Sequence, residues 1–178
     1  RYFDQRVAES ITLAGQLAIK WAERAVNTEM NKLLETPDKD YVIAIDTDSV
    51  YLNMSSLVDK FTPKDPVKFL DKICREHFEK VLTKSFEDMA SYTNAYVNRM
   101  EMGREVIADR GIWVAKKRYI LNVHNSEGVQ YAEPKLKMMG IEAIKSSTPQ
   151  IVRERMKEMF AILVKGSETE TQKFISNF

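Results

Sequence analysis

Two aspartates separated by a single residue, Asp46 and Asp48, are the side chains of this sequence best suited to chemistry. They lie in an Asp-Thr-Asp-Ser tetrapeptide between two apolar segments. Because successive side chains of a strand alternate between its faces, two aspartates with this spacing can be directed at one cation. Carboxylate oxygens favour hard cations, Mg²⁺ or Mn²⁺, which bind through a few carboxylates together with substrate phosphates. A solvated turn is the alternative interpretation of this pair.

A basic run forms the second group of interest. Lys116, Lys117 and Arg118 are consecutive and are followed by Tyr119. We expect all four on one strand, where Lys117 and Tyr119 share a face and form the side that contacts nucleic acid. Residues 110–147 hold 7 basic and 3 acidic side chains, net +4, whereas residues 1–109 hold 15 basic and 19 acidic, net −4. An acidic section followed by a basic one fits a metal site beside a surface that binds a polyanion. The simpler alternative is that these charges lie on solvated faces and on a basic edge strand.

Several other site classes are excluded by composition. A single cysteine, Cys74, rules out a disulfide framework and a cysteine-rich metal site. The two histidines, His77 and His124, are too far apart in sequence to favour a histidine-rich zinc site. No apolar stretch is long enough to span a membrane. No leader pattern is evident either, so we expect a reducing cytoplasm.

The first half of the chain predicts helices around a hairpin. Apolar residues at three- and four-residue steps predict a long helix over residues 4–35. Segments 41–45 and 50–54 are β-branched and apolar, and the polar residues 46–49 lie between them, which predicts a strand, a tight turn and a strand. A second helix is expected over residues 67–91.

The second half predicts short antiparallel strands and then helices. Strands are expected over 105–108, 112–115, 118–123 and 128–131, with turns at Gly111, Asn125 and Gly128. Ser147-Thr148-Pro149 predicts a helix start, continuing to about residue 165, and a short helix is expected after Ser167. The fold class is therefore α+β: one antiparallel sheet, built from the hairpin and the later strands, covered on one face by long helices.

The hexapeptide over residues 46–51, Asp-Thr-Asp-Ser-Val-Tyr, resembles motif C of the family B DNA polymerases. In that family a Tyr-Gly pair precedes the motif, whereas this sequence has Ala44-Ile45. Four further segments are similar to the family in the same order: residues 1–4 to the return from the fingers helix, 104–108 to a palm strand, 116–119 to the Lys-Lys-Arg-Tyr motif, and 145–149 to the start of the thumb. The similarity to polymerases of large tailed phages extends over essentially the whole chain.

The resemblance implies a role for each candidate residue. Asp48 is the principal ligand and Asp46 an acidic partner for the Mg²⁺ or Mn²⁺ of a site that uses two ions in the complete enzyme. Glu105 supplies a third carboxylate that orients the cluster. The basic run contacts primer–template DNA, with Lys117 in the minor groove and Tyr119 beside the primer end. Thr47 is a turn former and a candidate contact to the incoming dNTP.

The resemblance also implies a division of the chain and a partner. Residues 1–146 correspond to the C-terminal part of a palm domain, and 147–178 to the start of a thumb. Motif A, with its catalytic aspartate, and motif B, with its lysine, have no counterpart in the sequence. We therefore expect a fragment, or the downstream half of a split polymerase, that is inactive without an upstream polypeptide carrying the missing aspartate, fingers and exonuclease. Expression in an infected bacterial host would place it in the cytoplasm.

Two alternatives remain open at this stage. A non-catalytic nucleic-acid-binding fragment would use the basic strand while the aspartates only form a turn. A nucleotide-sugar transferase also uses Asp-x-Asp to hold a metal and a diphosphate, but it predicts βαβ alternation and a phosphate-binding glycine loop, and the sequence displays neither pattern.

Overall fold

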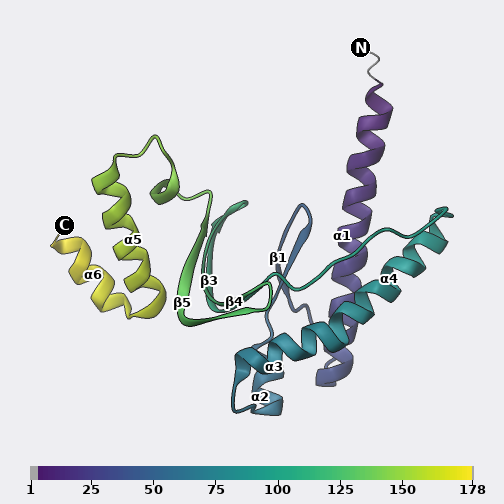
Figure 1. Ribbon diagram of the computed structural model, residues 1–178, viewed down its shortest axis with the longest axis horizontal. Coiled ribbons are helices and arrows are strands. Elements are labelled where there is room, and N and C mark those ends of the chain that lie inside the picture. The colour runs from purple at the N-terminus through teal and green to yellow at the C-terminus, as the bar shows by residue number, and fades with distance from the viewer. Residues whose placement is uncertain (1–3, 178) are drawn as a thin grey trace. The chain divides into compact units, whose positions relative to one another are not determined.

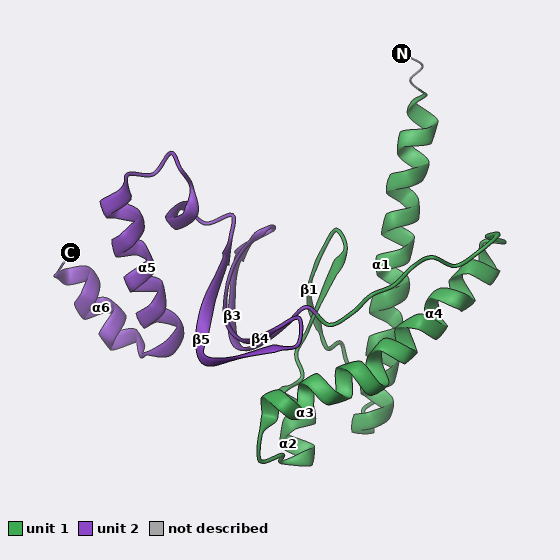
Figure 2. Ribbon diagram, in the orientation of Figure 1, with its two compact units in different colours: residues 1–104 green, residues 105–178 purple. Residues whose placement is uncertain are grey.

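The computed structural model describes residues 4–177, and the chain separates into two compact units that divide between Arg104 and Glu105 (Figure 1, Figure 2). The resemblance noted at residues 1–3 therefore lies outside the described residues. Each unit has its own core.

The first unit begins with α1, Gln5–Leu34, which matches the helix predicted over residues 4–35. Asp4 caps it, because its carboxylate accepts a hydrogen bond from the Arg6 N–H at 2.9 Å. The buried face of α1 repeats every four residues at Ala18, Ala22, Val26 and Met30. This face packs in one cluster with Phe78, Leu82 and Phe86, which belong to the helical region after the hairpin.

The predicted hairpin follows as β1, Val42–Asp46, and β2, Ser49–Leu52, paired antiparallel. The pairing is irregular between Val42 and Ala44, where one extra residue of β1 forms a bulge. Val42, Val50 and Leu52 pack against the core of the first unit, so this face of the hairpin is apolar and anchored. A short helix, α2, Ser55–Phe61, comes next and was not predicted from the sequence.

The helix predicted over residues 67–91 is formed in three sections. These are α3, Pro66–Ile73; a π-helical segment, η1, Cys74–Phe78; and α4, Glu79–Tyr92. Asp65 caps the first section by accepting from the Lys68 N–H at 3.1 Å. Phe78, Leu82 and Phe86 are buried against α1, so the change of helical pitch still leaves an apolar face toward the core.

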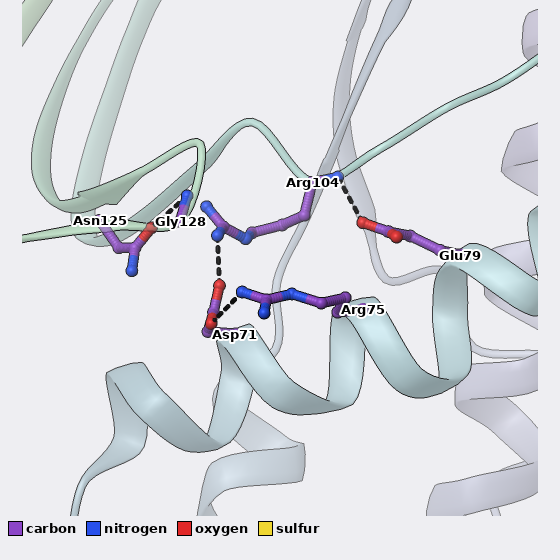
Figure 3. Close-up of polar contacts among 6 residues, drawn as sticks. All are labelled: Asp71, Arg75, Glu79, Arg104, Asn125 and Gly128. Carbon is purple, nitrogen blue, oxygen red and sulfur yellow. Dashed lines mark hydrogen bonds and ion pairs between the residues drawn. The ribbon is translucent and has the colours of Figure 1, made fainter.

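The last residue of the first unit is held by a polar network on α3 and α4 (Figure 3). The Arg104 guanidinium pairs with the Asp71 carboxylate, which also accepts from Arg75 at 2.7 Å. The Arg104 backbone N–H donates to the Glu79 carboxylate at 3.1 Å. The segment after α4 is therefore tied back to the helices on either side of the π-helical turn.

The second unit contains a three-stranded antiparallel sheet in the order β3, β4, β5. Its strands are β3, Val106–Ala115; β4, Arg118–Ser126; and β5, Val129–Met139. The prediction of a turn at Gly111 is wrong, because β3 continues through this residue and pairs it with Leu121. A side chain is absent there because the Trp113 ring covers the position: a Cβ on Gly111 would lie 2.6 Å from that ring. β5 also extends eight residues beyond the predicted end at Tyr131, to Met139.

Helices cover one face of this sheet. A 3-10 turn, η2, Glu142–Ile144, precedes α5, Gln150–Lys165, and α6, Glu168–Ser176. Ile120 of β4 packs with Ile141, Ala143 and Val164 in the core of the unit. The two predicted C-terminal helices are confirmed, and Ser167 caps α6 in a reciprocal capping box with Glu170. α5, by contrast, starts after Pro149 without a side-chain cap.

The α+β class predicted from sequence is confirmed, but the single sheet is not. Over the described residues, β1 pairs only with β2, and the later strands form a separate sheet. None of the helices in the described part of the chain is long and apolar enough to cross a membrane.

Candidate metal-binding hairpin and basic turn

Asp46 and Asp48 lie at the tip of the β1–β2 hairpin. Asp46 ends β1 and pairs with Ser49, which leaves Thr47 and Asp48 as a two-residue turn. Thr47 has φ of +48°, a left-handed conformation that β-branched residues rarely adopt. Such strain costs about 1–3 kcal/mol and tends to be found at functional sites. The turn is tighter than the four-residue tip expected from the sequence.

The strand register places Asp46 on the outward face of the hairpin. Val50 and Leu52 face the core, so Ser49 and Tyr51 alternate to the other side, and their partners in β1 are Asp46 and Ala44. Val42 nevertheless faces the core, although it lies four positions before Asp46 and regular alternation would put both side chains on the same face. The bulge reconciles these positions, because its extra residue, Ile43, shifts the alternation by one.

The donors at the tip suit a hard cation. Thr47 Oγ1 donates to the Asp46 carboxylate at 3.1 Å, and Ser49 Oγ to the Asp48 carboxylate at 3.4 Å. Asp48 is exposed and Asp46 half-buried, so a cation could reach the tip from solvent. Carboxylates and hydroxyls form an all-oxygen set, which fits Mg²⁺ or Mn²⁺. The described residues contain no group of three or more acidic, histidine or cysteine side chains around a possible metal position. The tip by itself offers at most two carboxylates and two hydroxyls to a cation.

Glu105, the third predicted carboxylate, is the first residue of the second unit. It directly precedes β3, and its carboxylate forms an ion pair with Lys137 of β5. Both side chains are partly exposed. Within its own unit Glu105 is thus a charged, paired residue at the start of a strand.

The basic run is not a continuous strand, and this part of the prediction is wrong. Ala115 pairs with Arg118, so Lys116 and Lys117 form a two-residue hairpin turn, with Lys117 at φ +61°. Strand alternation does not apply to them, and the expected common face of Lys117 and Tyr119 does not exist. Gly140, at φ +64°, allows the end of β5 to pass against this turn, because a Cβ there would collide with the Lys117 carbonyl oxygen. The turn is consequently backed by main chain.

Arg118 and Tyr119 begin β4, in different surroundings. The Arg118 guanidinium lies 3.4 Å from the Glu142 carboxylate, which also accepts from Lys145 at 2.9 Å. The hydrogen bond from Lys145, together with the nearby charge of Arg118, lowers the pKa of Glu142. Tyr119 is 5% exposed, and its ring lies 6.3 Å from that of Trp113, centroid to centroid.

Two polar residues that support the hairpin were not predicted from the sequence. Asn27 and Asn31 of α1 form hydrogen bonds to the chain that leads into β1. Two asparagines four residues apart lie on one helix face, directly before a polar loop, and this spacing was the signal available in the sequence.

Comparison with known proteins finds two similar phage proteins, both described as DNA-directed DNA polymerases. The chain is 41% identical to that of Escherichia phage RB69 over 182 aligned positions, covering 94% of the chain and 20% of the relative. It is 35% identical to that of Enterobacteria phage T4 over 192 positions, covering the whole chain and 21% of the relative. The chain thus spans about one fifth of the length of the curated relatives it matches. No family model matches.

Proposed function

We propose that this chain, which is homologous to a part of the phage family B DNA polymerases, supplies the metal-binding hairpin of a DNA-templated DNA polymerase. The observation that carries the proposal is the Asp46–Asp48 tip, an all-oxygen donor set on a strained two-residue turn. In this proposal residues 1–146 belong to a palm domain and 147–178 to the start of a thumb.

Asp48 and Asp46 would hold the divalent cations of the site. When bound, Mg²⁺ or Mn²⁺ polarises the primer 3′ hydroxyl and neutralises charge on the triphosphate. The two carboxylates fix the position of that charge, and the hydroxyls of Thr47 and Ser49 orient the carboxylate oxygens. Thr47, at the apex of the turn, is the proposed contact to the dNTP.

DNA contacts are proposed for the basic turn. Lys116 and Lys117 project from a hairpin end and can approach the minor groove of a primer–template duplex, where contacts do not read sequence. Arg118 and Tyr119 complete the motif, with the buried Tyr119 supporting the turn from β4. Glu105 is proposed to orient the acidic cluster.

An upstream polypeptide is proposed to complete the site. Within the described residues β1 and β2 pair only with each other, and a two-stranded sheet leaves main-chain groups along both outer edges. A further strand carrying another aspartate would satisfy one edge and add the ligand that the tip lacks. The chain alone is therefore proposed to be inactive, and the complete enzyme to act in the cytoplasm of an infected bacterial host.

A non-catalytic nucleic-acid-binding fragment is the second candidate. It is favoured by the Lys116–Lys117 turn and by the net charge of +4 over residues 110–147, from 7 basic and 3 acidic side chains. It requires only the basic turn, with the aspartates as turn formers. A nucleotide-sugar transferase is less well supported, since the strands described here pair antiparallel.

Primer extension tests the proposal. The chain would replace the homologous fifth of the RB69 polymerase, with and without Asp48→Asn, and both chimeras would be assayed with Mg²⁺ and with Mn²⁺. We expect nucleotide incorporation by the parent chimera and its loss, by about a hundredfold or more, in Asp48→Asn, with unchanged affinity for primer–template DNA. Equal activity of the two chimeras would contradict a metal-binding role for Asp48.

The isolated 178-residue chain provides the companion assay. We expect no incorporation from the chain or from its Asp48→Asn variant. Incorporation by the parent chain that is lost in the variant would support the chemistry but overturn the need for an upstream polypeptide. Retained DNA binding combined with inactive chimeras would favour the second candidate.

A further inference from the structure

The chain between α1 and β1 is held by two amide side chains of α1. Asn31 forms four hydrogen bonds, which use both atoms of its amide. Its Oδ1 accepts from the Lys39 N–H at 2.8 Å and from Thr36 Oγ1 at 2.7 Å. Its Nδ2 donates to the Lys39 carbonyl at 2.7 Å and to the Asn27 carbonyl at 2.9 Å. Lys39 is thus bound at both its main-chain N–H and its carbonyl.

Asn27 lies one helical turn earlier and binds the next residues of the same segment. Its Oδ1 accepts from the Tyr41 N–H at 2.8 Å, and its Nδ2 donates to the Asp40 carboxylate at 2.8 Å. The same Asp40 oxygen accepts from the Val42 N–H, the first residue of β1, at 2.9 Å. The two asparagines therefore bind residues 39–41 directly, and Val42 through Asp40.

We call Asn27, Asn31 and the hydrogen bonds that they form with residues 39–41 the clamp. Tyr41 is the residue of this segment that also contacts the hairpin. It is 3% exposed, and its hydroxyl lies 2.9 Å from Thr36 Oγ1. Its carbonyl accepts from the Asn53 N–H, just after β2, at 2.8 Å. The residue is fixed at its N–H, its carbonyl and its ring, so the base of the hairpin has a defined position.

The hairpin needs this constraint because its side-chain pattern does not specify a register. Residues 42–45 are all apolar, so either face of β1 can be buried at similar cost. Only the bulge at Ile43 lets Val42 face the core while Asp46 faces outward. Without the bulge, Asp46 would be directed at the core. The clamp immediately precedes that bulge.

We propose that Asn27 and Asn31 are positioning residues, which fix the register of β1 and so keep Asp46 and Asp48 on one exposed tip. This inference rests on the function proposed above. The asparagines touch neither cation nor substrate and act through the main chain of residues 39–42. A clamp that only stabilised the fold would leave the cation affinity of the folded chain unchanged, and the experiment is built on this difference.

The experiment is a titration of the ¹⁵N-labelled chain with Mn²⁺ alone, followed by paramagnetic broadening of backbone amide signals. In the parent, we expect broadening centred on residues 46–49, and its loss in Asp48→Asn. In Asn27→Asp, the donor to Asp40 is lost and two carboxylates face each other. We expect apparent Mn²⁺ affinity at the tip to fall about tenfold, the scale seen when supports of ligands are removed.

A charge swap is the rescue variant. Combining Asn27→Asp with Asp40→Asn restores one amide and one carboxylate to the pair, and the carboxylate at position 27 still accepts from Tyr41. We expect the swap to recover most of the Mn²⁺ affinity. Thr28→Ala, an exposed change on the same helix, is the matched control and should leave the affinity unchanged. Asn31→Asp is the second test, because it keeps the bonds that Oδ1 accepts and loses those that Nδ2 donates.

The outcomes separate the two hypotheses. Identical broadening in the parent and in Asp48→Asn would overturn the proposed metal-binding function itself. Localised binding in the parent that is unchanged in folded Asn27→Asp and Asn31→Asp would overturn the positioning role alone. If Asn27→Asp does not fold, the Mn²⁺ affinities of Asn31→Asp and of the charge-swap variant test the positioning role instead. A charge-swap variant that folds but binds Mn²⁺ weakly would contradict the proposal. Amide signals of the α1–α4 core report folding in each sample.

Discussion

At the level of single residues, one strained position lies between the two aspartates. A β-branched residue at φ +48° is maintained only where the surrounding structure compels it. Here the pairing of Asp46 with Ser49 closes the strands around two residues, and Thr47 is one of them. The strain accompanies a two-residue turn, which holds Asp48 beside the end of the strand that carries Asp46.

Cys74 gives the first residue-scale prediction. Burial, partly offset by the Arg104 charge, raises the pKa of its thiol to about 11 from an ordinary value of 9.0. Since the thiolate is the nucleophile, the native chain should react with a disulfide reagent at pH 8 about a hundredfold more slowly than the urea-unfolded chain. Because Cys74 is the single cysteine, the released chromophore reports this residue alone.

The same shift fixes a pH dependence. A thiol whose pKa is raised on folding contributes stability at pH values below 9, and this is lost as the pH rises toward about 11. A Cys74→Ser variant, measured alongside, should lack that loss. Native and unfolded chains that react equally fast would show that the thiol is accessible and that its pKa is not raised by burial.

Gly111 gives a second residue-scale prediction. A Cβ there would lie 2.6 Å from the Trp113 ring and 2.8 Å from Leu121, and Leu121 is buried. Gly111→Ala should therefore destabilise the second unit by about 1–3 kcal/mol, as overpacking does. Urea unfolding of a Trp21→Phe background, followed by Trp113 fluorescence, measures the loss.

Gly15 provides the opposite control. It lies within α1, and a methyl group added there would meet nothing within 4 Å, so Gly15→Ala should stabilise the helix by about 0.5–1 kcal/mol. A stabilising effect of Gly111→Ala, or no effect, would mean that the Trp113 ring moves aside without cost.

At the level of elements, the π-helical turn between α3 and α4 coincides with the anchor of the segment that follows α4. Asp71 lies before η1, Glu79 directly after it, and Arg104 reaches both. Removing the Arg104 charge leaves the Asp71 carboxylate with the exposed Arg75 as its remaining cation. The Arg104 and Asp71 side chains are 11% and 20% exposed, so this loss carries a penalty.

Arg104→Gln should accordingly destabilise the first unit by about 1.5–3 kcal/mol, the scale of a lost hydrogen bond to a charged group. Arg75→Gln is the matched control, because Arg75 pairs with the same Asp71 but is 61% exposed. Its loss should cost less than about 1 kcal/mol. Hydrogen exchange of the α3 and α4 amides measures both, and equal effects of the two substitutions would contradict the special role of Arg104.

The sequence predicted the elements whose apolar repeat continues over many residues or whose turn has a clear polar signal. The thirty residues of α1 repeat an apolar face, and the Asp-Thr-Asp-Ser tip separates two β-branched segments. Gly111 was misinterpreted because a glycine in a strand and a glycine in a turn look alike until the ring that covers it is known. The π-helical turn is invisible to a pattern of apolar spacing, since Phe78 and Leu82 continue the buried face across it.

The same reasoning explains what was and was not foreseen at the site. Asp46 and Asp48 were singled out as candidates because the chemistry of metal binding constrains residue type and spacing. The outward face of Asp46 was not predictable, because it depends on a bulge among the apolar residues that precede it in β1. The Lys116–Lys117 turn was placed on a strand because neither lysine is a typical turn residue. Its backing by Gly140 is a contact between residues far apart in sequence.

At the level of the whole molecule, the chain spans about one fifth of its phage relatives and yet divides into two units with separate cores. The first unit buries its apolar residues between α1 and α4, and the second between its sheet and α5. The acidic tip belongs to the first unit and the basic turn to the second. Chains with more than one such core often unfold in more than one step.

Each unit contains one of the two tryptophans of the chain, Trp21 in α1 and Trp113 in β3. Single-tryptophan variants, Trp113→Phe and Trp21→Phe, should therefore report the urea unfolding of one unit each. We expect two distinct midpoints, with the second unit unfolding first because its buried cluster is the smaller one. Circular dichroism of each variant, recorded in the same samples, should show both transitions. Coincident midpoints by both probes would instead mean that the units unfold as one cooperative structure, and that a change at the acidic tip would alter the stability of the basic turn as well.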